Sequence, residues 1–226
     1  MSPRLERKRQ AAEHAPPPSA RSCPAALRCQ TLRADSLVVP NLVAMTPEDV
    51  RQLARAVPDR WTEIEFVHRS DYIDVHATVR HGELDAVRLP DGFRIHERGA
   101  PPSSWTVRPL EPYATNYRWS AMLDPYELTA GVEITDVRTG DLFGRPVVAF
   151  IARAVAGYEP VCSCCPLVFS EISQRMEYGE DWEPRSGELP DGVDMALDVE
   201  VGIVVSGRDR GGRNGNWFTN EILRAS

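Results

Sequence analysis

The first regular hydrophobic pattern lies between residues 46 and 57 and has the spacing of a helix. Its apolar side chains recur every three or four residues, which places them on one helical face: Val50, Leu53, Ala54 and Val57. Thr46 followed by Pro47 is typical of a helix N-terminus, because threonine can cap free backbone N–H groups and proline fits the first turn. Pro58 ends the pattern. The sequence therefore predicts one amphipathic helix over about 47–57.

From Trp61 onward the hydrophobic period changes to two, which is the spacing of strands with one buried face. The alternating runs end at turn-forming residues, His81-Gly82 and Pro90-Asp91-Gly92, and this favours an antiparallel meander. We expect its strands over residues 64–68, 72–80, 84–89 and 93–96.

The second half of the chain follows a proline-rich loop at 99–116, of the kind that often forms a lid or a binding loop. Asp124 is expected to cap a single turn over 124–128. A hairpin is predicted with strands at 132–137 and 145–156 around Thr139-Gly140, and residues 169–178 fit either a strand or a helix. A strand over 194–205, a tip at 207–216 and a strand over 217–223 complete the pattern.

One early helix followed by eight to ten short strands predicts an α+β fold. Because an amphipathic helix and a one-sided sheet bury their apolar faces on each other, we expect a curved antiparallel sheet, a half-open barrel, packed on the N-terminal helix within residues 46–226. Residues 1–35 mix charge, proline and serine without periodicity, and so bury too little surface to offset the entropy of ordering. They are predicted to form a disordered tail.

Four short segments occur in a characteristic order along the chain: Leu89–Ile95, Trp119–Leu128, Gly144–Val148 and Leu197–Val204. This order resembles the lipoprotein-carrier (LolA-like) superfamily, in particular its actinobacterial members, over roughly residues 46–223. The resemblance implies a half-open barrel whose concave apolar face holds an acyl chain or a hydrophobic segment of a partner, and it brings no catalytic residues. The chain departs from that family in lacking an export signal and a lipobox, and in its cysteine-rich stretch.

The net charge of the chain argues against two classes of binding partner. A formal net charge of -7 argues against nucleic acid and against an anionic membrane surface, since both require a cationic face. The chain start lacks the uninterrupted apolar stretch of a secretory signal, and no apolar run is long enough to span a bilayer. We therefore expect a soluble cytoplasmic protein. Met45 is a second candidate for the start of translation.

Aromatic residues are the candidates for ligand binding. Six of them are expected to line either the core or an apolar groove, two roles that the sequence does not separate: Trp61, Phe66, Tyr72, Trp105, Trp119 and Phe150. No acid/base pair or phosphate loop reaches a motif. The sequence thus predicts a non-catalytic binding protein for a lipid-like ligand or a protein partner.

The alternative prediction is a thiol-based metal or redox module, because three of the five cysteines fall within four positions: Cys162, Cys164 and Cys165. On an extended strand the first two would point to one side and Cys165 to the other. Three interpretations stay open, namely buried structural thiols, ligands for zinc or copper, and a labile disulfide. Cys23 and Cys29 are expected to be unconstrained thiols of the tail.

Two further groups of polar residues have simpler explanations. His68 and His76 are expected either to face solvent or to face each other across the first hairpin, beside Asp71 or Asp74. The acidic residues between 191 and 200 fit a solvated strand face, and the glycine- and arginine-rich segment 208–215 fits a long hairpin tip.

Overall fold

The computed structural model describes residues 44–80, 82–89, 91–98, 118–213 and 215–226. The predicted tail at 1–35, with Cys23 and Cys29, lies outside these residues, and so does Trp105. No helix in the described part of the chain combines the length and the apolar composition that crossing a bilayer requires.

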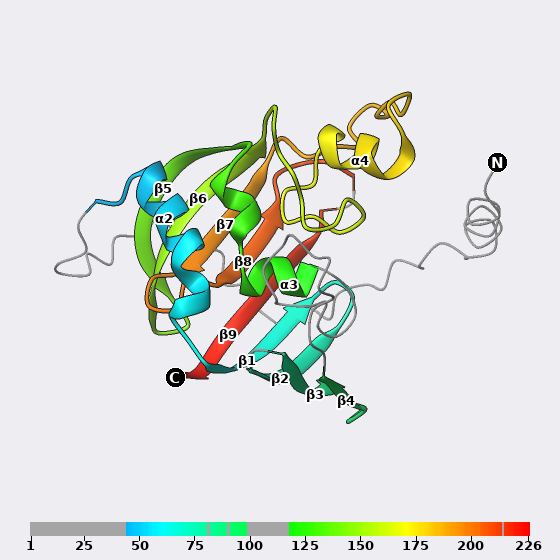
Figure 1. The fold of residues 1–226 in the computed structure, drawn as a ribbon. Coiled ribbons are helices and arrows are strands. Elements are labelled where there is room, and N and C mark those ends of the chain that lie inside the picture. Colours follow the sequence, from blue (N-terminus) through cyan, green and yellow to red (C-terminus); the bar gives the residue numbers. More distant parts are fainter. Residues whose placement is uncertain (1–43, 81, 90, 99–117, 214) are drawn as a thin grey trace, which may run out of the picture. The chain divides into compact units, whose positions relative to one another are not determined.

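All the described strands belong to one antiparallel sheet in the order β4-β3-β2-β1-β9-β8-β7-β6-β5. Strands β1 to β4 form a first meander, and strands β5 to β9 form a second meander that ends where β9 pairs with β1. The two end strands, β4 and β5, do not pair, so the sheet is open (Figure 1), and the predicted fold class is confirmed. The bounds are Glu63–Ser70 (β1), Asp74–Arg80 (β2), Glu83–Leu89 (β3), Arg94–Arg98 (β4), Val132–Leu142 (β5), Arg145–Ala154 (β6), Val193–Asp198 (β7), Val204–Asp209 (β8) and Trp217–Ala225 (β9).

Helix α2 (Pro47–Ala56) confirms the predicted helix and its cap, and it continues as a 3-10 turn, η1 (Val57–Asp59). The Thr46 side chain accepts a hydrogen bond from the Asp49 N–H, and the Asp49 carboxylate accepts one from the Thr46 N–H, which is a capping box. The helix packs over the turn between β7 and β8. A Cβ added at Gly202 of that turn would lie 2.6 Å from Val57, so glycine permits this close approach.

Helix α3 (Arg118–Leu123) lies on the same face of the sheet as α2 (Figure 1). Its Trp119 ring lies 5.6 Å from the ring of Phe66 and 4.8 Å from that of His68, both on β1. These contacts place the centre of the core between α3 and the strands at which the two meanders meet.

The single turn after α3 is present as η2 (Tyr126–Thr129), but the prediction of Asp124 as its cap was wrong. The Asp124 N–H donates to Ser120 O at 2.9 Å, so this residue still belongs to the last turn of α3. Pro125 holds the cap position and makes no side-chain capping bond.

The hairpin of β5 and β6 turns later than predicted. Thr139 and Gly140 are paired within the strands, and the turn falls at Phe143 and Gly144, whose φ angles of 55° and 75° suit a two-residue hairpin turn. A bulge between Thr135 and Arg138 disturbs the alternation of β5 without ending the strand. That disturbance explains why the sequence pattern placed the turn too early.

The strand predicted over 194–205 is in fact two strands, β7 and β8. The Asp198 carboxylate accepts hydrogen bonds from the N–H groups of Glu200 and Val201, and this bends the chain into a turn. Val201 and Ile203 are buried in and after this turn, so apolar residues continue through it and conceal it in the sequence. Asp198 is also fully buried in an ion pair with Arg145, which corrects its assignment to a solvated strand face.

Residues 169–178, which fitted a strand or a helix equally well, form helix α4 (Glu171–Tyr178). Ser170 and Ser173 cap its start reciprocally, since each side-chain oxygen accepts the other residue's N–H. Helix α4 follows directly after the segment that contains the three cysteines.

Candidate functional site

The three cysteines lie in an irregular segment, residues 158–168, here called the cysteine loop. The Sγ atoms of Cys162 and Cys164 are 2.9 Å apart, and those of Cys164 and Cys165 are 3.8 Å apart. All three sulfurs lie within 4.8 Å of one another. The expectation that Cys165 points away from the other two was therefore wrong, because the segment turns here and does not run as a strand.

Both ends of the cysteine loop are fixed by one buried carboxylate, that of Glu127 in η2. Its oxygens accept hydrogen bonds from the Tyr158 hydroxyl at 2.7 Å, the Val161 N–H at 2.8 Å and the Leu167 N–H at 2.7 Å. Burial raises the pKa of Glu127, while these three hydrogen bonds and the positive charge of Arg118 act in the opposite direction. A single side chain thus holds the loop on both sides of the thiols.

Two more contacts complete the attachment of the cysteine loop. The Tyr158 hydroxyl accepts a hydrogen bond from the Val168 N–H at 3.2 Å, and burial raises the pKa of that tyrosine well above its ordinary value. In the middle of the loop, the Ser163 hydroxyl donates to Glu177 of α4 at 2.7 Å. The loop is therefore fixed to η2 at its ends and to α4 at its centre.

The surroundings of two of the thiols, Cys164 and Cys165, favour the protonated form. Desolvation of the sulfur raises the pKa of Cys164 to about 12, although the residue as a whole is exposed, and the hydrogen bond with Cys162 and the nearness of Cys165 add to the rise. Burial also raises the pKa of Cys165, against a hydrogen bond from the Arg118 backbone. Because a nucleophilic cysteine needs a depressed pKa, the raised pKa values of Cys164 and Cys165 do not suit these two thiols to covalent catalysis.

The spacing of the sulfurs suits a soft metal ion. A metal–sulfur bond of about 2.3 Å in tetrahedral geometry places two sulfurs about 3.8 Å apart. The separation of 3.8 Å between Cys164 and Cys165 meets this value, and the closer pair would have to open by about 1 Å. Thiolate ligands select ions such as zinc and monovalent copper. The spacing of the sulfurs alone fits either ion.

The five predicted aromatic residues that the structure describes do not gather at one site. Four of them are at most 2% exposed and belong to the core: Trp61, Phe66, Trp119 and Phe150. Tyr72 is 74% exposed, and Trp105 lies outside the described residues. Of the five predicted aromatic residues that the structure describes, Tyr72 is thus the one that a ligand can reach directly.

Tyr72 borders an open hollow of about 240 Å³ at the turn between β1 and β2. The walls are mostly polar and come from this turn and from the end of β3: Ser70, Asp71, Tyr72, Ile73, Asp74, Arg88 and Leu89. Pockets for small molecules usually have about 300–1,000 Å³. This hollow therefore has room for one side chain or the end of a longer ligand.

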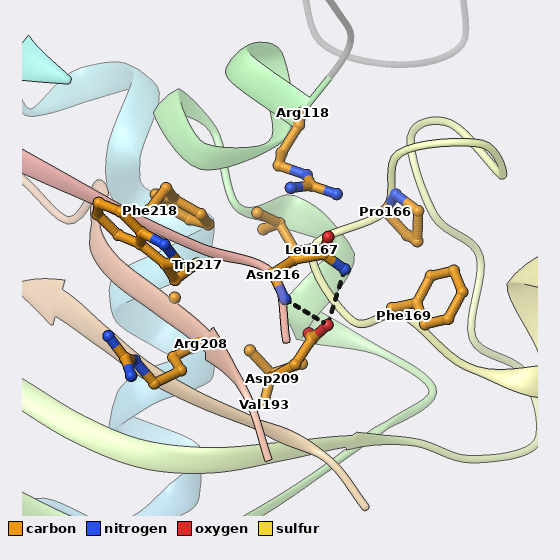
Figure 2. A pocket seen from close by; sticks show the side chains of 11 residues that line it. Arg118, Pro166, Leu167, Phe169, Val193, Arg208, Asp209, Asn216, Trp217 and Phe218 are labelled. Carbon is orange, nitrogen blue, oxygen red and sulfur yellow. Dashed lines mark hydrogen bonds between the residues drawn. The ribbon is translucent and has the colours of Figure 1, made fainter. Parts of the chain in front are cut away.

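A second hollow adjoins the cysteine loop (Figure 2), since Pro166 and Leu167 form part of its wall. It offers about 10 Å³ of free space, which is room for about one water molecule. Asp209 lines it and accepts hydrogen bonds from the backbone N–H of Asn216 at 3.2 Å and from its side chain at 2.8 Å. Burial raises the pKa of Asp209, and the two hydrogen bonds from Asn216 and the positive charge of Arg118 partly offset this. Neither hollow is the apolar groove that the sequence predicted.

The histidines do not form a joint site. His76 lies opposite Val67, so His68 and His76 are on different faces of the sheet, and their predicted meeting was wrong. His68 does not face solvent either, because it is 3% exposed and its Nδ1 lies 2.8 Å from Asn220 Oδ1. Burial lowers the pKa of His68 to about 4, whereas His76 pairs with Glu65 at the surface.

The sequence analysis missed the most important residue of the site, Glu127. A glutamate in a short turn is usually exposed, and no local signal shows that a distant loop folds over it. The one available hint was that Glu127 stands between the apolar residues Tyr126 and Leu128.

Comparisons with known proteins give only remote likenesses. No protein-family model matches the sequence, and no curated protein does. A crystal structure of MucB in complex with MucA(peri) is similar at 14% identity and a TM-score of 0.39, over 80% of this chain and 57% of the matched chain. A crystal structure of MucB has 14% identity and a TM-score of 0.38, over 77% of this chain and 57% of that one.

A third match is the complex of Pseudomonas aeruginosa MucA and MucB, with 14% identity and a TM-score of 0.38, over 79% of this chain and 58% of the matched chain. The chain thus spans less than two thirds of the length of these proteins. At such values the likeness carries no conclusion about activity or partners. The open antiparallel sheet is observed directly, and membership of the LolA-like superfamily stays a prediction.

Proposed function

We propose that the protein binds a soft metal ion through Cys162, Cys164 and Cys165. The observation that carries this proposal is the convergence of three sulfurs within 4.8 Å on a loop that is fixed at both ends. Holding the ligands in place before the ion arrives lowers the ordering cost of binding. A cytoplasmic location, which keeps thiols reduced, belongs to the same proposal.

Metal analysis of the full chain, purified without an affinity tag, tests the proposal. We expect about one equivalent of bound metal in the wild type and none in a C162S/C164S/C165S variant. The matched control is C23S/C29S, which removes the other two cysteines and should bind as the wild type does. A wild type that takes up neither zinc nor copper under reducing conditions, or a triple variant that retains its metal, would refute the proposal.

A second candidate function is the binding of a lipid-like ligand or a protein partner. It is supported by the hollow at the β1–β2 turn, where the exposed Tyr72 and Leu89 border free space. Titration with a fluorescent fatty acid should then show binding that Y72A weakens by at least about tenfold, the loss of one buried aromatic contact. The control is Y178A, which removes an exposed tyrosine of α4 instead. Equal binding by both variants would exclude this hollow.

A further inference from the structure

We propose that the bound ion is monovalent copper, held by the three sulfurs of the cysteine loop without a fourth protein ligand. This inference rests on the metal-binding function proposed above. Three features of the described residues support this choice: the number of donor atoms, the occupation of the nearby carboxylates, and the rigidity of the loop.

The first feature is the number of donors. Within the described residues, the group of candidate ligands at this place consists of three thiols. Structural zinc sites almost always use four protein ligands in tetrahedral geometry. Thiolate sulfur is the donor that selects monovalent copper, and this ion does not require a fourth ligand. A three-sulfur site is therefore complete for copper and incomplete for structural zinc.

The second feature is that the carboxylates around the loop are already engaged. Glu127 uses its oxygens to accept three hydrogen bonds, and Glu177 accepts the hydroxyl proton of Ser163. Zinc accepts a carboxylate as a ligand, whereas monovalent copper prefers sulfur. Recruiting either carboxylate to the ion would break the contacts that hold the loop.

The third feature is the rigidity of the cysteine loop. Its two ends are tied to one buried side chain, and the prolines Pro160 and Pro166 restrict the backbone next to the thiols. Cys165 is buried and Cys164 is exposed, so the ion would lie at the boundary of the protein, where water solvates the excess negative charge of the thiolates. As each copper–sulfur bond forms, the thiol proton leaves to solvent.

The test is a pair of titrations of the reduced, full-length protein without oxygen. Cu(I) is supplied in competition with bathocuproine disulfonate, and zinc in competition with 4-(2-pyridylazo)resorcinol. We expect one Cu(I) per chain with three sulfur neighbours by X-ray absorption, and zinc that is lost to micromolar chelator. Each of C162S, C164S and C165S should weaken copper binding by at least about tenfold, whereas C23S/C29S should leave it unchanged.

The possible outcomes separate this inference from the proposal on which it rests. Zinc held against the chelator with four ligands, or zinc binding that C23S/C29S abolishes, would overturn the copper assignment and leave metal binding intact. Copper with two sulfur neighbours, or no change in affinity in one of the single variants, would overturn the three-sulfur site. Failure of the wild type to bind either ion would overturn the proposed function itself.

Discussion

The protein has two buried polar networks, one around His68 and one around Glu127, and they differ in the parts of the chain that they join. The histidine network lies between β1 and β9. The Asn220 amide nitrogen donates to Val204 O at 2.7 Å and contacts Met122 Sδ at 3.2 Å, so the amide oxygen is the atom that faces His68. Because an amide oxygen only accepts, His68 donates to it from Nδ1. Trp119 and Phe218 flank the imidazole. Every one of these partners belongs to a strand or helix of the core.

The carboxylate network of Glu127 and Tyr158 is equally buried, but its partners are backbone N–H groups of the cysteine loop. The histidine network joins elements that already pack on each other, so it contributes to the specificity of the core. The carboxylate network gives a fixed conformation to a segment without regular structure. This contrast is the physical reason for placing function at the cysteines and not at the histidines.

Removing the centre of the carboxylate network should have the largest effect. Glu127→Ala leaves the Tyr158 hydroxyl and two backbone N–H groups buried without an acceptor, so we expect a loss of about 3–5 kcal/mol in the free energy of unfolding. Urea denaturation of the full chain measures it. Glu183→Gln, at an exposed position, is the control and should change stability by less than about 0.5 kcal/mol. Equal effects of the two changes would mean that Glu127 does not hold the loop.

The histidine network should show itself in the pH dependence of stability. The pKa of His68 falls from 6.5 to about 4 on folding, because burial disfavours the imidazolium. The unfolded chain therefore binds the proton first, and stability is lost as the pH falls from 6.5 to about 4. The loss from this residue amounts to about 3 kcal/mol at the acid end.

Urea denaturation between pH 7 and pH 4 tests this prediction by comparing three chains. His68→Gln should reduce the slope of stability against pH over this interval by more than His76→Gln does, because His76 lies at the surface of the same hairpin. Carboxylates also titrate near pH 4, but His68 is hydrogen-bonded to Asn220 and not to a carboxylate, so they contribute equally in the wild type and in His68→Gln. An identical slope in His68→Gln and the wild type would show that the imidazole does not resist protonation in the folded state.

The same contrast explains what the sequence could predict. Local periodicity predicted α2, the alternation of β1 and the antiparallel first meander, because each depends on neighbours within a few residues. Both networks depend instead on pairs that are far apart in the chain. His68 and Asn220 are separated by 152 positions, and Glu127 and Leu167 by 40. The cysteine cluster was visible in the sequence. The convergence of its sulfurs was not visible, because it depends on the distant residue Glu127.

A smaller effect should follow from trimming the carboxylate network. Tyr158→Phe keeps the ring in the core and removes the hydroxyl that joins Glu127 to the Val168 N–H. We expect a loss of about 1–2 kcal/mol in stability, since one buried hydrogen-bonding group is removed and one N–H loses its acceptor. Tyr178→Phe on the exposed end of α4 is the matched control and should be neutral. A neutral Tyr158→Phe would indicate that water replaces the hydroxyl.

The smallest effect is expected at the centre of the loop, and it separates the role of the ends from that of the middle. Ser163→Ala removes the contact between the Ser163 hydroxyl and Glu177 but leaves every bond to Glu127 in place. Because this contact is only partly buried, we expect a loss of about 0.5–1 kcal/mol in stability. Ser206→Ala, at a half-buried position of β8, is a suitable control.

The same variant tests which contacts set the positions of the sulfurs. If the contacts at the ends of the loop set them, Ser163→Ala should leave the Cu(I) affinity within about threefold of the wild type. Glu127→Gln should then lower the Cu(I) affinity by more than about tenfold, as expected for a lost supporting contact of a metal site. A larger loss of Cu(I) affinity in Ser163→Ala than in Glu127→Gln would mean that the contact with α4, and not the contacts with η2, positions the sulfurs.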